Sequence, residues 1–192
     1  EHRVTGVRGS ITAVRPGASG DITPPSKEAH GEFIAWTMDL ELPRTATPRP
    51  TLRQEKARWA TGCLLVGVDE VGRGPLAGPV VAAAVVFPAN TRRITGLRDS
   101  KLLSAAQRER LVPRIRERAL RIAVAAASVR EIDRFNIRVA TAIAMRRAVT
   151  RALVGLEAWE ILVDGLPFPE LGFPHQALVS GDAHCASIAA AG

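Results

Sequence analysis

The strongest constraint on the fold is an alternation of short apolar runs with capped helical segments over residues 51–192. Short apolar runs bounded by Gly, Pro or Asp are typical of buried strands, whereas longer periodic segments are typical of helices. We expect a helix over 51–60 and strands over 64–68, 80–87, 120–127, 160–163 and 177–179. This order predicts an α/β layer structure with a mixed β-sheet.

Capping signals mark where the helices begin and end. Ser104–Gln107 and Ser128–Glu131 each have the spacing of a capping box. Asn136 begins the clearest helix, in which apolar residues form one stripe, and Gly155 is suited to end it. The segment behind the first capping box contains Pro113, where we expect a kink.

The first 48 residues differ in composition from the rest of the chain. Six of the 13 prolines fall within the first 50 residues, and the only apolar piece there is a short one at 33–38. We expect residues 1–48 to be a flexible extension or a segment foreign to the natural protein, with a small partner-binding arm as the alternative. Residues 49–192 are expected to form one domain.

The chain is basic, with a formal net charge of +7 and a pI of about 10.8. The first 48 residues hold five basic and six acidic side chains, so the positive excess lies in residues 49–192. This balance favours polyanionic partners through neutralisation of phosphates. A ribosomal protein, or a genome that prefers Arg codons, would produce the same balance.

Several classes of protein are disfavoured by what the sequence contains. No apolar run is long enough for a membrane span, and no basic-then-apolar start of signal-peptide type is present. Cys63 and Cys185 lie far apart and have no metal-like spacing. We expect both thiols to be reduced, in a cytoplasmic protein without a membrane partner.

Four carboxylates stand at the ends of predicted strands or just after them. They are Asp69, Glu70, Asp164 and Asp182. Strand ends are where α/β proteins gather their sites, and acids crowded in a cleft need a hard cation such as Mg²⁺ or Mn²⁺. Two such ions about 4 Å apart can activate a water and stabilise a leaving oxygen. The alternative for each acid alone is a turn or cap residue. Adjacent acids inside an ideal strand would point to opposite faces, so both can face one ion only at a strand end.

Two further motifs are suited to binding phosphate, although each is weak alone. In Gly72-Arg73-Gly74, the glycines permit close backbone approach while the Arg reaches a phosphate; the alternative is an ordinary turn. Asp99-Ser100-Lys101 offers a hydroxyl, an ammonium and helix N–H groups, and its alternative is a solvated loop. No supportable Ser/His/Asp spacing and no P-loop is present, so nucleophilic-residue and nucleotide-hydrolase functions are disfavoured.

The segment Val66-Gly-Val-Asp-Glu-Val-Gly-Arg-Gly-Pro-Leu-Ala-Gly-Pro-Val80 closely resembles the opening motif of the ribonuclease HII family. Other segments resemble the family in order and approximate spacing. They are Thr51–Gly62 (the lead-in helix), Asp99-Ser-Lys101 with Leu103-Ser104, Asn136-Ile137 with Ala140-Thr141 and Ala144-Met145, Val163-Asp164-Gly165, and Gly181-Asp182 with Ser187-Ile-Ala-Ala-Ala191. The resemblance therefore extends over residues 51–192.

This resemblance implies a ribonuclease H-like fold, with a mixed sheet flanked by helices. It implies an endoribonuclease that cleaves the RNA strand of RNA/DNA hybrids and cuts 5′ of single ribonucleotides embedded in duplex DNA. Such enzymes act in ribonucleotide excision, use Mn²⁺ or Mg²⁺ in a two-metal mechanism and leave 5′-phosphate ends. We expect a monomer on the same grounds.

The resemblance also implies roles for individual residues. The metal-binding catalytic acids would be Asp69, Glu70, Asp164 and Asp182. Gly72, Arg73 and Gly74 would read the 2′-hydroxyl at the RNA–DNA junction. Ser100 and Lys101 would hold backbone phosphate, and Asn136 and Thr141 would face the opposing DNA strand.

The sequence departs from the family pattern at its C-terminal end. The family continues through further helices, which also carry a Tyr that packs against the junction nucleotide and the docking segment for the sliding clamp. This chain contains no Tyr, and Gly192 stands where the family usually has Ser. The alternative to a working enzyme is therefore a truncated product that is marginally stable and weak or inactive alone, and we do not expect this chain to dock on the clamp.

Two alternatives of other classes remain open. One is a nucleic-acid-binding module without catalysis, which metal-dependent binding of a ribonucleotide-containing duplex without cutting would favour. The other is a different nuclease or strand-transfer enzyme of the same broad fold, which cleavage of a plain DNA duplex would favour.

Overall fold

The computed structural model describes residues 48–74 and 78–192, so the expectations for residues 1–47 and the middle of the opening motif lie outside the described residues. After a lead-in helix, the elements follow in the order strand, strand, helix, strand, helix, strand, strand and two short helices, which differs from the prediction only in having two helices at the end. They are α1 (Arg53–Trp59), β1 (Leu64–Val71), β2 (Val80–Val86), the 3₁₀ turn η1 (Ser100–Leu102), α2 (Ala105–Arg118), β3 (Arg121–Ala127), α3 (Val129–Ala152), β4 (Trp159–Asp164), the 3₁₀ turn η2 (Pro169–Leu171), β5 (Gln176–Leu178), α4 (Gly181–His184) and α5 (Ala186–Ala191).

The strands form one five-stranded sheet in the order β3-β2-β1-β4-β5. β1 pairs with β2, and β2 with β3, in antiparallel fashion, while β1–β4 and β4–β5 are parallel pairs. The predicted mixed sheet is therefore confirmed. α3 connects the antiparallel part to β4, as the return to a parallel neighbour requires.

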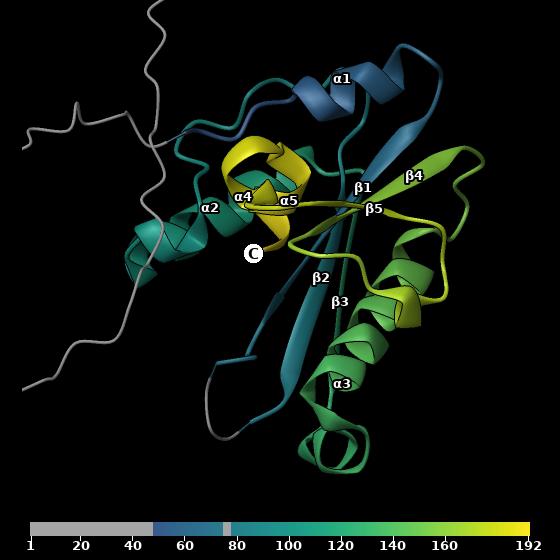
Figure 1. Cartoon of the computed structure of the whole chain (residues 1–192). Helices are drawn as coiled ribbons and strands as arrows, with labels where there is room; N and C mark the ends of the chain where they lie inside the picture. The colour runs from purple at the N-terminus through teal and green to yellow at the C-terminus, as the bar shows by residue number, and fades with distance from the viewer. Residues whose placement is uncertain (1–47, 75–77) are drawn as a thin grey trace, which may run out of the picture. The chain divides into compact units, whose positions relative to one another are not determined.

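α3 covers one face of the sheet (Figure 1). Its small buried side chains, such as Ala140 and Ala144, pack in one apolar cluster with Val66 and Val68 of β1. Alanines on the helix face allow its axis to approach the strands closely, and Met145 fills the remaining space. The stripe that predicted this helix from the sequence is thus its buried face.

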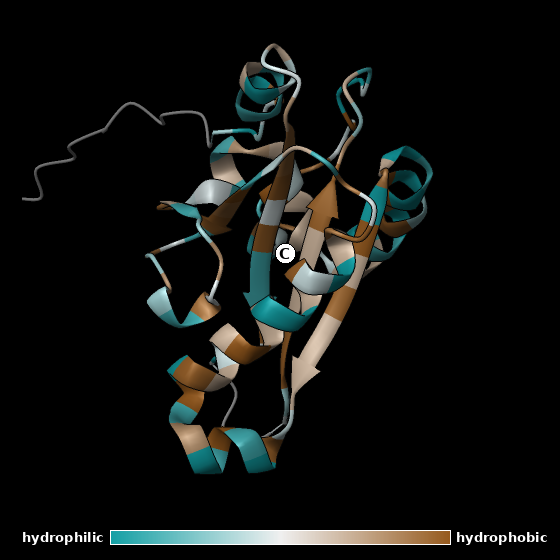
Figure 2. Cartoon of the chain, turned by 90° about the vertical axis from the view of Figure 1, so that its right-hand side faces the viewer, coloured by the Kyte–Doolittle hydropathy of each residue, from teal (hydrophilic) through white to brown (hydrophobic). Residues whose placement is uncertain are grey.

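α5 and α2 lie on the opposite face of the sheet (Figure 1). A β carbon at Gly67 would collide with the backbone of Ser187, so glycine lets α5 lie directly on β1. Leu111 of α2 packs in one cluster with Phe87 and Ala189. Brown apolar colouring is concentrated in the strands between these layers (Figure 2).

The helix caps agree with the sequence. Both predicted capping boxes are formed, at Ser104 and at Ser128, and α2 continues through Pro113. α3 is interrupted at Asn136, where φ is 68° and ψ is 166°, and the Asn136 side chain accepts a hydrogen bond from Val139 N at 3.1 Å. The part of α3 after this break begins where a cap was expected. None of the described helices combines the length and apolar character needed to cross a bilayer.

Candidate active site

The parallel pairing of β1 with β4 places Asp69 and Asp164 beside each other. Val68 pairs with Val163 at the last step of this ladder, and the two aspartates are the next residue on each strand. Leu65 and Leu162, an even number of residues before them, share the apolar cluster on the α5 side of the sheet. Because strand side chains alternate, both aspartates lie on that side.

Asp182 joins this pair from the turn that follows β5. Ser180 adopts a left-handed conformation with φ 54°, and the N–H of Gly181 donates to Asp164 Oδ1 at 2.5 Å. A β carbon at Gly181 would lie 3.1 Å from that oxygen and 2.6 Å from Ile188 Cδ1, so a larger residue here would crowd both side chains. Asp182 follows in the first turn of α4 and is buried.

The three aspartates repel one another. Burial raises the pKa of Asp69 from 3.8 to about 8; the neighbouring charge of Asp164 contributes, while a hydrogen bond from Glu70 N at 2.7 Å opposes the rise. Burial and the charge of Asp164 also raise the pKa of Asp182, which Lys101 opposes from 4.0 Å. Burial and crowding of the carboxylates therefore disfavour the charged forms of Asp69 and Asp182, and Lys101 offsets this only at Asp182.

β1 extends further than the sequence predicted, which changes the setting of Glu70. β1 was expected to end before Asp69, but its ladder with β2 continues through Glu70–Ala82 to Val71–Val81. Both acids are thus inside the strand and point to opposite faces. Glu70 accepts a hydrogen bond from Arg73 Nη1 at 3.1 Å and faces a cavity of about 510 Å³.

That cavity adjoins the acidic site on the side of Glu70. Its lining comprises Glu70, Arg73, Arg138, Asp164, Gly165, Leu166, Pro167 and Phe168. Arg73 lies over the Phe168 ring at 5.7 Å, and Arg138 pairs with Glu170 at 3.3 Å. Sequence reasoning missed Arg138 and Phe168, because neither belongs to a local pattern that singles it out.

The chemistry of the donor set fits a divalent cation, although the side chains are not arranged around one. Within 48–74 and 78–192, no three Asp, Glu, His or Cys side chains converge as a metal shell. Asp164 instead accepts from Gly181 N, Asp69 from Glu70 N, and Glu70 from Arg73. Adjacent carboxylate oxygens without other donor types match the preference of Mg²⁺ and Mn²⁺.

The Gly72-Arg73-Gly74 turn brings its Arg to the site. Gly72 has φ 96°, and a β carbon there would lie 2.8 Å from Pro79 O, so this position requires glycine. A β carbon added at Gly74 would have no heavy atom of the described residues within 4 Å. Among the described residues, none fills the space beside Gly74, which follows Arg73 in the chain.

The Asp99-Ser100-Lys101 motif lies beside Asp182. Asp99 caps the turn η1 by accepting from Lys101 N at 2.9 Å, and Lys101 Nζ is 4.0 Å from Asp182 Oδ2. Asp99 also raises the pKa of Asp182 through its charge and a hydrogen bond. The sequence pointed to Ser100 and Lys101 but not to Asp99 as a further acid of the site.

The two α3 residues assigned from the resemblance are placed very differently. Asn136 is exposed at the break in α3, with its side-chain oxygen facing Val139 N. Thr141 is fully buried, and its hydroxyl donates to Ile137 O at 2.7 Å. Thr141 thus has no surface available to a duplex, because it lies on the packed face of the helix.

An α/β sheet of this order, with aspartates gathered at the ends of its two central parallel strands, defines a ribonuclease H-like protein. The chain belongs to the ribonuclease HII family, whose model matches residues 66–192. It is 52% identical over 140 residues to ribonuclease HII of Acidovorax sp. strain JS42, covering 73% of this chain and 66% of that protein.

Solved structures show the same fold. Ribonuclease H2 from Pyrococcus horikoshii aligns with a TM-score of 0.55 and 28% identity, over 67% of this chain and 68% of that one. Bst-RNase HIII, solved in complex with Mn²⁺, aligns with a TM-score of 0.55 and 23% identity, over 67% of this chain and 49% of that one. The predicted ribonuclease H-like fold is confirmed.

Proposed function

We propose that this chain is an endonuclease that cleaves the RNA strand of RNA/DNA hybrids and cuts duplex DNA on the 5′ side of a single embedded ribonucleotide. The observation that carries the proposal is the gathering of Asp69, Asp164 and Asp182 on one face at the end of the central parallel strands. Membership of the ribonuclease HII family supports the substrate class.

The acidic site would hold Mn²⁺ or Mg²⁺ through Asp69, Asp164 and Asp182, with Glu70 approaching from the other face of β1. The bound ions would supply an activated water and stabilisation of the leaving 3′-oxygen. The Mn²⁺ complex of Bst-RNase HIII supports this choice of metal. The raised pKa of Asp69 supports it too, because a cation would relieve the repulsion that disfavours its charged form.

Residues around the acids would position the substrate. Lys101, 4.0 Å from Asp182, and Ser100 beside it would bind a phosphate next to the scissile bond. Arg73 and the backbone at Gly74 would contact the ribonucleotide, whose 2′-hydroxyl distinguishes it from DNA. Asn136 at the break in α3 would contact the opposing strand.

The test is cleavage of a panel of labelled duplexes by the purified chain with Mn²⁺ and, separately, Mg²⁺. The panel holds a DNA duplex with one ribonucleotide, the same duplex without it, and an RNA/DNA hybrid. We expect a cut on the 5′ side of the ribonucleotide and no cut in plain DNA. Cleavage of plain DNA would indicate a different nuclease, and metal-dependent binding without cutting would indicate a binding module.

A further inference from the structure

Glu55 is a buried carboxylate that the proposed chemistry does not use. It lies in α1, and its side chain is completely inaccessible to solvent. Its Oε1 accepts hydrogen bonds from Ser187 N at 2.7 Å, from Ser187 Oγ at 2.8 Å and from Cys185 Sγ at 3.2 Å. One oxygen therefore fixes the backbone and side chains of a segment 130 residues further along the chain.

The backbone before α1 holds the same segment. Thr51 N donates to His184 O at 3.2 Å, and Ala186 N donates to Thr51 O at 3.1 Å. These bonds form an isolated parallel bridge between Thr51 and Cys185. The start of α1 and the Cys185–Ser187 segment are thus joined by both backbone and side-chain hydrogen bonds.

This segment is where Asp182 is anchored. α4 has only four residues, too few to be stable by itself, and Cys185 links it to α5 in an extended conformation. On the other side, α5 lies against the backbone of Gly67 in β1. Ser187 is therefore held between β1 and Glu55, five residues after Asp182.

We propose that Glu55 is a positioning residue that keeps Asp182 in place in the acidic site by holding the Cys185–Ser187 segment; the inference rests on the proposed metal-dependent function. Burying a carboxylate is unfavourable unless it is well hydrogen-bonded, and an apolar residue would fill the same space. The second oxygen of Glu55 has no hydrogen-bond partner among the described residues. All the hydrogen bonds that Glu55 makes with its side chain among the described residues are thus directed to the Cys185–Ser187 segment.

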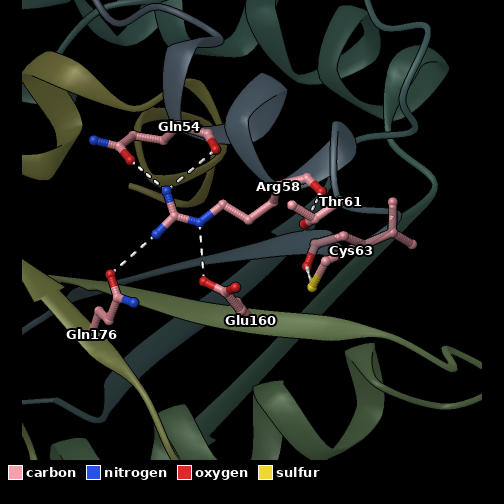
Figure 3. A network of polar contacts seen from close by, with 7 residues as sticks. Gln54, Arg58, Thr61, Cys63, Glu160 and Gln176 are labelled. Carbon is pink, nitrogen blue, oxygen red and sulfur yellow. Dashed lines mark hydrogen bonds and ion pairs between the residues drawn. The ribbon is translucent and has the colours of Figure 1, made fainter.

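α1 has a second, separate attachment to the sheet, which provides a matched control. Arg58 donates from Nε to Glu160 Oε2 of β4 at 3.1 Å and from Nη2 to Gln176 Oε1 of β5 at 3.1 Å (Figure 3). Glu160→Ala removes an ion pair of α1 but leaves the bonds of Glu55 intact. This variant therefore distinguishes an effect of loosening α1 from an effect of losing the Glu55 contact.

The experiment is calorimetric titration of the purified chain with Mn²⁺, without nucleic acid. We expect Glu55→Leu to weaken Mn²⁺ binding about 10- to 100-fold, as loss of an outer-shell partner does. Glu55→Gln, which keeps the accepting oxygen, and Glu160→Ala should bind Mn²⁺ as the unsubstituted chain does. In an Asp182→Asn background, Glu55→Leu should have little further effect, since it acts through Asp182.

The possible outcomes distinguish failure of the proposed function from failure of the proposed role of Glu55. No Mn²⁺ binding by the folded, unsubstituted chain would contradict the proposed function itself. Normal binding by that chain and equal binding by Glu55→Leu would overturn the role of Glu55, as would the same weakening with and without Asp182. If Glu55→Leu does not fold, Ser187→Ala tests the contact from the other end and should accelerate amide exchange over 181–187 and weaken Mn²⁺ binding.

Discussion

The backbone N–H of Gly181 donates a hydrogen bond to Asp164 Oδ1 at 2.5 Å, which ties the start of α4 to the end of β4. Asp164 ends a strand, and Asp182 lies directly after the donor residue. This single bond therefore brings together two of the proposed metal-binding acids. Because glycine has no side chain, there is room at Gly181 for this close contact.

Gly181→Ala is expected to weaken Mn²⁺ binding and to lower the free energy of unfolding by about 1–3 kcal/mol, because the new methyl group would crowd Ile188 and the Asp164 carboxylate. Gly62→Ala is the control for general destabilisation. Gly62 has a positive φ of 74°, which Gly181 does not, and a β carbon added there would have no atom of the described residues within 4 Å. It should lose stability through backbone strain alone. Equal Mn²⁺ affinity of both variants in titration would contradict the prediction.

Asp69 is expected to make the metal-free protein less stable as pH rises. Its folded-state pKa of about 8 lies above the ordinary 3.8, so between these values the folded state binds the proton more tightly than the unfolded state. Stability is therefore lost as pH rises through this window. Asp69→Asn should flatten this dependence and raise the Tm at neutral pH. Thermal unfolding in the presence of a chelator, at pH values between 3.8 and about 8, measures this dependence. A steeper dependence of Tm on pH in Asp69→Asn would contradict the prediction.

Asn136 allows its backbone and side-chain roles to be separated. Its φ of 68° is unfavourable for a side-chain-bearing residue, and replacement of Asn by Gly at an N-cap loses only a few tenths of a kcal/mol. Asn136→Gly should therefore fold at least as stably as the unsubstituted chain, whereas Asn136→Ala should lose about 1 kcal/mol. If the side chain contacts DNA, both variants bind the duplex more weakly in fluorescence anisotropy. Unchanged binding by Asn136→Gly would remove Asn136 from the interface.

Ser128 provides a purely structural comparison. Its hydroxyl caps α3 by accepting from Glu131 N at 3.3 Å, and none of the proposed metal-binding acids takes part in this cap. Ser128→Ala should lower the free energy of unfolding by about 1 kcal/mol in denaturant titration. Mn²⁺ affinity should be unchanged, and a loss of affinity would mean that general destabilisation alone disturbs the acidic site.

Local pattern was sufficient to predict much of the fold. The strands, both capping boxes and the buried stripe of α3 follow from periodicity and from end signals that act over a few residues. The end of β1 could not be predicted, because the ladder that carries it past Glu70 is made with β2. Hydrogen bonding to another strand decided the face on which Glu70 lies.

The acids of the candidate site could be predicted from the sequence, whereas most residues that contact them could not. Asp69, Asp164 and Asp182 stood out because each is next to a predicted strand end and within a family motif. The contacts of Asp99 with Asp182 and of Glu55 with Ser187 join residues far apart in the chain, so no spacing reveals them. The burial of Thr141 likewise depends on which side of α3 meets the sheet.

The most direct test of the central claim is the initial rate of cleavage of a DNA duplex with one ribonucleotide, measured against Mn²⁺ concentration. The unsubstituted chain is compared with Asp69→Asn and Asp164→Asn, each shown to be folded. We expect a saturable, Mn²⁺-dependent cut on the 5′ side of the ribonucleotide that both substitutions abolish. A cut that persists in both variants, or that does not depend on a divalent cation, would contradict it.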